Sequence, residues 1–161
     1  PKEMGYLPGL IYDSLPDGWG MLLMDRLFRK AGRDPARVSP LDRLAFIGAR
    51  AMGALSFIPP QDDGMPTADW SLLQLAQAAR NVSDDDVTAL RMLAQAGGSP
   101  HGARPKALVR FDAATRTVST VDDAAGEPWL VKFPAQSEHP EVCAIEGCAL
   151  AAIAAMTTPA K

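Results

Sequence analysis

The spacing of apolar residues changes once along this chain, near the pair Gly97-Gly98, and that change limits the fold more than any other feature. Before this pair, apolar residues recur every three or four positions, as in amphipathic helices. After it, apolar and polar residues alternate in short runs, as in strands, until a final alanine-rich segment. The sequence therefore predicts an α+β chain in which a helical amino-terminal subdomain precedes a small antiparallel sheet with one helix.

Capping residues divide the first half of the chain into helices. Asp17 can cap a helix that runs to about Ala31 and ends at Gly32. The apolar stripe of this helix consists of Trp19, Leu22, Leu23, Leu27 and Phe28. Ser39, which is followed by proline at the first helical position, begins a second helix that stops before Gly53.

The remainder of the first half contains a strand-like segment, a linker and two more helices. Residues 54–58 alternate as a short strand, and residues 59–68 are rich in proline, glycine and aspartate, as linkers are. Thr67 or Asp69 begins the third helix. Ser83 begins the fourth, because the aspartates that follow it complement the helix dipole.

Three strands and a helix are predicted after the glycine pair. Residues 106–111 form the first strand, residues 115–121 its hairpin partner, and residues 129–133 the third strand, which ends at a proline. Residues 140–156 form the helix. Its inward-facing positions are Val142, Ile145, Leu150 and Ile153.

Composition excludes several classes of protein. A net charge of −3 and a pI near 5.3 give no reason to expect binding to nucleic acid by charge attraction. No apolar run approaches the roughly 18 residues of a membrane span, and the first residues do not resemble a signal peptide.

Cys143 and Cys148 are predicted to be buried, reduced thiols, which favours a cytoplasmic protein. The histidines are too few for a zinc site, and position 1 is not methionine, as in a piece cut from something larger.

Residues 97–106 form a glycine-rich segment that leads directly into a predicted strand. Glycines allow backbone N–H groups to approach an anion closely, and successive N–H groups in a turn form an anion-binding nest. Arg104 and Lys106 add two cations beside it, which suits a polyphosphate. The segment lacks the Gly-Lys-Ser/Thr of a Walker motif. The alternative is an ordinary flexible connector between a helix and a sheet.

Lys132 lies among apolar residues of the third predicted strand and needs either solvent or a carboxylate. Glu146 in the following helix is a candidate partner. A strand lysine that pairs with a helix glutamate after a glycine-rich loop is the arrangement by which protein kinases hold nucleotide phosphates. Taken singly, each residue is more simply explained as a solvated surface charge, so the order of the three features carries the hypothesis.

The chain resembles HipA-type serine/threonine protein kinases, the toxins of bacterial toxin–antitoxin systems. The segments that carry this resemblance appear in the family's order: residues 15–20, 53–55, 99–106 and 130–134. The resemblance divides the chain into a helical amino-terminal subdomain at 1–60 that is truncated at its start, a linker with two helices at 61–96, and a kinase-like nucleotide lobe at 97–161.

The resemblance implies roles for individual residues. The loop that covers the ATP phosphates corresponds here to His101, Gly102, Ala103, Arg104, Pro105 and Lys106, and the lysine that contacts the phosphates corresponds to Lys132. Ser99 matches the loop serine that these kinases autophosphorylate. A phosphate there would add up to about two negative charges where ATP phosphates sit, so self-inhibition is expected.

The resemblance also implies what this chain lacks. ATP and Mg²⁺ serve the parent kinase, but no Asp, Asn or His follows Glu146, so neither a catalytic base nor metal ligands are expected here. The fragment is therefore expected to be inactive alone. Implied partners are a protein substrate, which resembles an aminoacyl-tRNA synthetase in well-known members, and a HipB-type DNA-binding antitoxin. An apolar surface left bare would favour self-association. The alternative is a stand-alone interaction or regulatory module that acts on a separate kinase chain.

Overall fold

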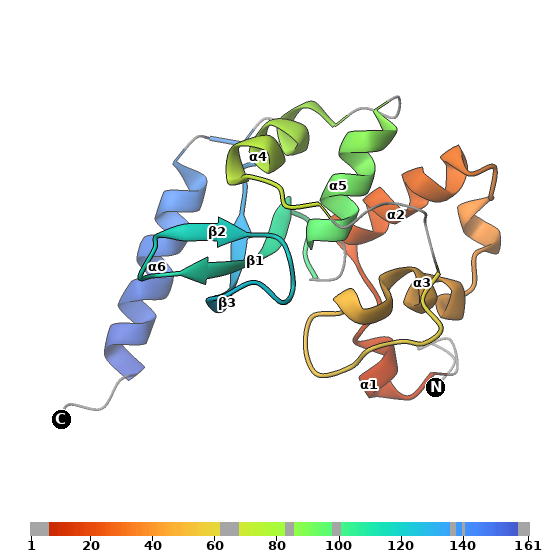
Figure 1. Ribbon diagram of the computed structural model, residues 1–161, viewed down its shortest axis with the longest axis horizontal. Helices are drawn as coiled ribbons and strands as arrows, with labels where there is room; N and C mark the ends of the chain where they lie inside the picture. The colour runs from red at the N-terminus through yellow and green to blue at the C-terminus, as the bar shows by residue number, and fades with distance from the viewer. Residues whose placement is uncertain are drawn as a thin grey trace.

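The computed structural model describes residues 7–61, 68–82, 86–97, 101–135, 138–139 and 141–157. Within these residues, five α-helices precede a three-stranded antiparallel sheet, and a sixth helix follows it (Figure 1). The predicted α+β class, with its helical first part and small sheet, is confirmed.

The first part contains five helices and two 3₁₀ turns within the described residues. Their bounds are α1 (Gly9–Tyr12), α2 (Gly18–Lys30), α3 (Pro40–Ile47), α4 (Leu72–Asn81) and α5 (Val87–Gly97), with 3₁₀ turns at Pro35–Arg37 and Gly48–Arg50. The sequence did not predict α1. The first predicted helix is confirmed as α2, which ends one residue before Ala31. Most of its predicted stripe is buried, but Leu22 is exposed, because it lies at the edge of the face that packs on the core.

Serines cap two of these helices in the same way. The side chains of Ser39 and Ser71 each accept a hydrogen bond from the third helical residue, Asp42 and Gln74, whose side chains bond back to the capping backbone. The start predicted for α4 at Thr67 or Asp69 is therefore wrong. The carboxylate of Asp69 instead accepts hydrogen bonds from the backbone and side chain of Thr120, beyond β2. Asp86 caps α5 by accepting from Ala89 N–H, while Ser83 lies outside the described residues.

The strand predicted at residues 54–58 is wrong. Alternating side chains are not sufficient for a strand, because its backbone groups need a partner strand. Here Phe57 N–H bonds to the carbonyl of Gly48, at the end of α3, and Ile58 is exposed. The segment therefore runs as a loop against the 3₁₀ turn rather than joining the sheet.

The sheet has the order β2-β1-β3, with β1 (Lys106–Asp112) in the centre between β2 (Thr117–Ser119) and β3 (Glu127–Lys132). Both pairings are antiparallel, and the predicted hairpin between the first two strands is confirmed. In the second pairing Lys106 lies directly opposite Lys132. Side chains directly opposite each other in such a pair extend from the same face of the sheet.

Helix α5 joins the helical part to the sheet (Figure 1). It packs against α2 and α4 on one side and against β1 on the other, and Leu90 and Leu93 are fully buried there. From the sheet side, Ala107, Val109 and Phe133 join the same hydrophobic cluster. The backbones meet most closely at Gly97, where a Cβ would lie 1.8 Å from the carbonyl oxygen of Lys106.

Helix α6 (Val142–Thr157) lies along the side of the sheet (Figure 1). The inward position predicted for Ile145 is wrong, since 63% of that residue is exposed. The side chains of Leu150 and Ile153 lie outside the described residues. Cys143 is half-buried and Cys148 exposed, so their predicted burial is also wrong, and both are free thiols. None of the helices in the described ranges has the length and apolar content required to cross a bilayer.

Candidate functional site

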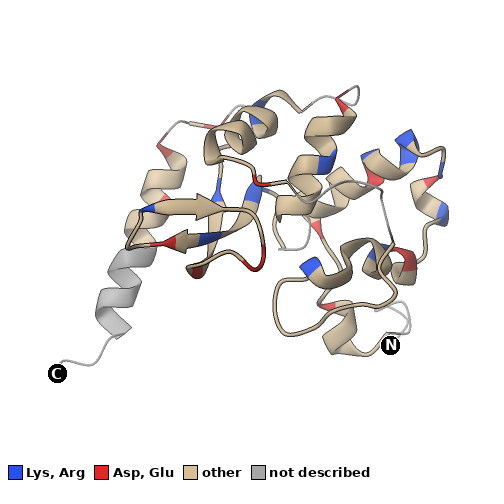
Figure 2. Cartoon of the chain, in the orientation of Figure 1, with Lys and Arg blue, Asp and Glu red and all other residues tan. Residues whose placement is uncertain are grey.

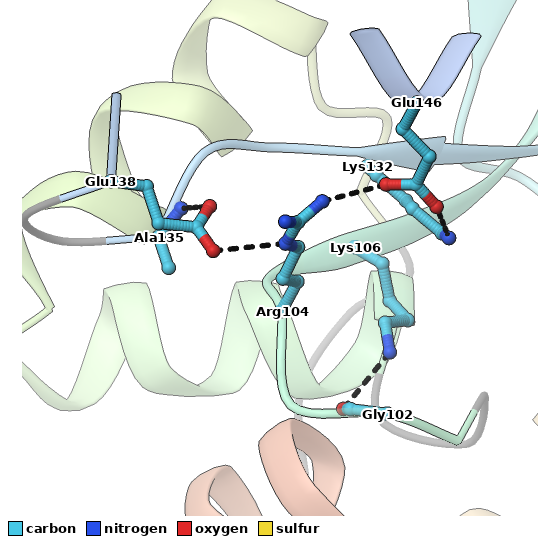
Figure 3. Close-up of polar contacts among 7 residues, drawn as sticks. All are labelled: Gly102, Arg104, Lys106, Lys132, Ala135, Glu138 and Glu146. Carbon is cyan, nitrogen blue, oxygen red and sulfur yellow. Dashed lines mark hydrogen bonds and ion pairs between the residues drawn. The ribbon is translucent and has the colours of Figure 1, made fainter. Parts of the chain in front are cut away.

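An open pocket of ≈ 600 Å³ lies between the glycine-rich loop, the sheet and α6. Its lining residues come from three parts of the chain: His101, Gly102, Ala103, Arg104 and Lys106 from the loop and β1, Lys132 from β3, and Val142, Ile145, Glu146 and Ala149 from α6. Three cations and one carboxylate therefore line one cavity. Figure 3 shows these charged side chains converging from the three elements.

The strand register places two of these cations side by side. Because Lys106 and Lys132 are directly opposite across β1 and β3, both side chains extend toward the pocket. Like charges at such positions repel, so each lysine requires a compensating group. The two lysines have different partners, and that difference distinguishes their roles.

The buried side chain of Lys106 holds the loop through hydrogen bonds. Only 2% of this residue is exposed, and its ammonium donates hydrogen bonds to the carbonyls of His101 and Gly102, the latter at 2.9 Å (Figure 3). Burial lowers the pKa of Lys106, the charge of Asp17 opposes that shift, and the charge of Lys132 reinforces it. The loop therefore closes over the ammonium of the strand that follows it.

Lys132 pairs with Glu146 on α6 (Figure 3). The other carboxylate oxygen of Glu146 accepts a hydrogen bond from Arg104 at 2.6 Å, so one side chain of α6 joins a strand and the loop. Hydrogen bonding from Lys132, aided by the positive charges of Lys132 and Arg104, holds the pKa of Glu146 below its usual value. Glu146 is therefore ionised at neutral pH.

Arg104 is held from its other side by Glu138. Its Nε donates to Glu138 at 2.9 Å, and the second oxygen of Glu138 accepts from the backbone N–H of Ala135 (Figure 3). That backbone bond, with help from Arg104, lowers the pKa of Glu138, while hydrogen bonding to Glu138 raises the pKa of Arg104. The guanidinium is thus fixed at the pocket wall by two carboxylates.

The start of α2 touches the other side of the loop. Gly102 N–H donates to the carboxylate of Asp17 at 2.5 Å, and Trp19 N–H donates to the carbonyl of Gly102 at 3.0 Å. One ring nitrogen of His101 lies 2.7 Å from the carbonyl of Leu15. We call these contacts of residues 15–19 with residues 101–102 the clasp.

The structure brings most of the sequence-predicted site residues together. Six of them, His101, Gly102, Ala103, Arg104, Lys106 and Lys132, line the pocket with Glu146. Pro105 does not line it, because it is buried at the head of β1, where its carbonyl accepts from Phe133 N–H. Ser99 lies outside the described residues.

Sequence reasoning missed two residues that hold the site. No sequence feature marked Glu138, because nothing in the adjacent sequence distinguishes it from a solvated surface charge. Asp17 was interpreted only as a helix cap. The glycine that follows it was a usable signal, since glycine is a poor helix former and often marks a close backbone approach.

A second group of basic residues gathers at the end of α2 and in the turn after it (Figure 2). Arg29, Lys30 and Arg37 are exposed there, and Arg33 pairs with Asp42 at 3.0 Å. Unlike the pocket cations, these residues lie on an outer helical surface, which is typical of a solvated face. Across the described part of the chain, no group of three His, Cys, Asp or Glu side chains is placed to hold a metal ion.

Comparison with known proteins identifies the first part of the chain. Residues 2–58 match the model of the HipA N-terminal domain family. No curated protein and no solved structure matches the chain. The family match includes the clasp residues 15–19 and ends before the pocket, so the chemistry assigned to the pocket depends on its geometry.

Proposed function

Residues 2–58 of this chain are a HipA-type amino-terminal portion, and from that premise we propose that the pocket behind it binds the phosphates of ATP. In this proposal the chain contributes the nucleotide half of a HipA-like serine/threonine protein kinase, the toxin of a toxin–antitoxin system. The kinase reaction transfers the terminal phosphoryl group of ATP to a hydroxyl of a protein.

The ion pair between Lys132 and Glu146 is the observation that carries this proposal. A lysine fixed by a helix carboxylate keeps its ammonium at one position, so it can neutralise phosphate oxygens without the entropy cost of ordering a free side chain. The pair stands at the wall of a pocket whose other side is a glycine-containing loop. Loop, strand lysine and helix glutamate are the three parts by which kinases hold the alpha and beta phosphates.

The lining residues fit a nucleoside triphosphate. A volume of ≈ 600 Å³ lies within the range of about 300–1,000 Å³ that is usual for small-ligand sites. Lys132 and Arg104 would hold the phosphates, and Val142 and Ile145 offer apolar surface beside them. The bound nucleotide would supply the phosphoryl group, while these residues bind and orient it. The described residues do not by themselves fit Mg²⁺, since they contain no cluster of metal ligands.

Partners and regulation follow from the same proposal. The protein substrate would be of the aminoacyl-tRNA synthetase class, and the antitoxin would be a DNA-binding protein of the HipB type. Phosphorylation of Ser99 would place negative charge at the loop that Lys106 and Arg104 border, which would oppose nucleotide binding.

Titration of the chain with ATP tests the pocket. We expect Lys132→Ala to weaken binding about tenfold or more, because one charge-assisted hydrogen bond to phosphate is lost. Lys30→Ala is the matched control, since Lys30 is exposed at the end of α2, outside the pocket. Isothermal titration calorimetry gives the affinities, and circular dichroism verifies that each variant is folded.

Two results would contradict the proposal. One is a chain that does not bind ATP at millimolar concentration. The other is equal weakening by Lys132→Ala and Lys30→Ala, which would indicate nonspecific attraction of the anion by surface charge.

Exposed apolar residues on β3 and α6 favour a second candidate function, a module that binds another protein. Trp129, Leu130 and Ile145 are all exposed on β3 and α6. Aromatic and aliphatic side chains at a surface are typical of binding sites. Analytical ultracentrifugation of the chain and of Trp129→Ser tests whether these residues form a binding surface: self-association that disappears in the variant favours the module, and a monomer in both gives the module no support.

A further inference from the structure

Asp17 is placed as a helix cap but bonds elsewhere. It is the N-cap residue of α2, yet its side chain makes no hydrogen bond to that helix. A capping aspartate normally accepts a hydrogen bond from the second or third helical N–H, which stabilises the helix. Here the carboxylate accepts from Gly102 N–H, 85 positions along the chain. The Asp17 carboxylate therefore binds the glycine-rich loop instead of capping α2.

The loop also accepts a hydrogen bond from the start of α2. The carbonyl of Gly102 accepts from Trp19 N–H at 3.0 Å, so it satisfies an N–H at the start of α2 that lacks an intrahelical partner. The same carbonyl accepts from the ammonium of Lys106 at 2.9 Å. Both polar groups of the Gly102 backbone are therefore bound by the start of α2, and its carbonyl is also bound by Lys106, the first residue of β1.

Glycine is required on both sides of the clasp. Gly18 has a φ of +39°, and a Cβ on it would lie 2.8 Å from the backbone of Gly102. Gly102 has a φ of +109°, and a Cβ on it would lie 2.8 Å from the ammonium of Lys106. Two backbones in conformations that favour glycine approach each other here. The contact leaves no room for a side chain between the start of α2 and the loop.

We propose that Asp17 is a positioning residue for the phosphate loop, through which the HipA-type amino-terminal portion holds the loop in its binding conformation. This inference deepens the proposed function and rests on it for the identity of the ligand. The residues that would touch phosphate are Arg104 and Lys132, whereas Asp17 is not among the pocket-lining residues and acts through Gly102.

The charge of Asp17 adds a second contribution. Its negative charge raises the pKa of Lys106 against the lowering effect of burial, and so helps to keep that ammonium charged where it braces the loop. A neutral side chain of the same shape would lose this effect as well as the strong acceptor for Gly102 N–H. Asp17→Asn is therefore a sharper test than a truncation.

The matched control is Asp34→Asn. Asp34 is also an exposed N-cap aspartate, at the start of the 3₁₀ turn Pro35–Arg37, and its carboxylate accepts from Ala36 N–H at 3.0 Å. The two substitutions change the net charge equally, and each neutralises the carboxylate of one exposed N-cap aspartate. Only Asp17 contacts the loop.

Hydrogen exchange measured by NMR on the full chain reports on the loop without any ligand. We expect Asp17→Asn to accelerate exchange at Gly102 N–H about tenfold, the factor that corresponds to losing about 1.4 kcal/mol of a charge-assisted hydrogen bond. The amide proton of Gly102 should also shift upfield as its acceptor becomes neutral. Asp34→Asn should change neither quantity. Unchanged exchange and shift at Gly102 in a folded Asp17→Asn variant would overturn the inference.

Titration with ATP adds a readout that a merely structural role would not change. We expect Asp17→Asn to weaken ATP binding severalfold, and Asp34→Asn to leave it unaltered even if both lower the melting temperature equally. Equal affinities in the two variants would overturn the positioning role. If the wild-type chain does not bind ATP, the proposed function fails, while exchange at Gly102 still decides whether Asp17 holds the loop.

Discussion

The helical part and the sheet part of this molecule are held together in different ways. In the helical part, apolar side chains of α2, α3, α4 and α5 form a closed core in which Leu23, Leu75, Leu90 and Leu93 are almost completely buried. In the sheet part, β1 alone is well covered, while β3 and α6 expose large apolar residues. The contacts described for α6 with its neighbours are chiefly the ion pairs of Glu146.

This difference places the candidate site where the chain is least packed. A dry core cannot accept a highly charged ligand, because unpaired buried charge is costly. Side chains held by ion pairs at a partly exposed surface, in contrast, keep their charge solvated and within reach of a phosphate. The helical part then holds the loop in place through α5 and through the clasp.

The largest expected effect compares one aliphatic residue from each part. Leu90→Ala should lower the free energy of unfolding by about 2–5 kcal/mol, because the side chain is fully buried in α5 and leaves a cavity. Ile145→Ala should change it by less than about 0.5 kcal/mol, since most of that side chain is already in water. Urea denaturation followed by circular dichroism measures both. Similar losses would mean that α6 packs as tightly as the core.

A smaller effect, of opposite sign in the two parts, is expected from replacing glycine by alanine. Gly97→Ala should destabilise by about 1–3 kcal/mol, because its Cβ would overlap the backbone of Lys106. Gly147→Ala should stabilise by about 0.5–1 kcal/mol, since nothing lies within 4 Å of that position and alanine favours a helix. Thermal unfolding of the two variants tests the contrast. Stabilisation by Gly97→Ala would disprove the close junction of α5 with β1.

The smallest effect is the response of α6 to acid. The pKa of Glu146 is lowered in the folded chain, so its ion pairs stabilise fully above its ordinary pKa of 4.5 and are lost as pH falls through the lowered value. We expect amide protection factors in α6, corrected for the intrinsic pH dependence of exchange, to fall between neutral pH and pH of about 3 more than those in α2. Glu146→Gln should remove this difference, and Glu141→Gln, at an exposed position, should preserve it. An equal fall in both helices would contradict it.

Local signals identified most of the secondary structure. Ser39 with the proline that follows it predicted α3, the apolar spacing predicted α2, and the alternation after residue 106 predicted the central hairpin. The failures have a common cause. Residues 54–58 alternate like a strand without a partner, and Ile145 lies at a helical apolar position without a surface to cover it. A periodic pattern predicts an element, but not what that element packs against.

The candidate site was predictable to a similar extent. The order of a glycine-rich loop, Lys132 and Glu146 indicated which residues to bring together, and they do line one pocket. The order did not indicate that Glu146 would also hold Arg104, or that Lys106 would be buried under its own loop. These depend on strand register and on the approach of α6, which no local pattern encodes.

The sequence alone determined helices α2 to α6, the loop and the three strands of the sheet, because periodicity, capping side chains and glycines act within a few residues of one another. Only the tertiary structure decided that Asp17 would leave its helix to bind Gly102, since that bond joins positions 85 residues apart. The choice between capping a helix and holding a loop depends on which N–H group lies within reach of the carboxylate. That distance is set by the packing of α2, α5 and β1 around their shared core.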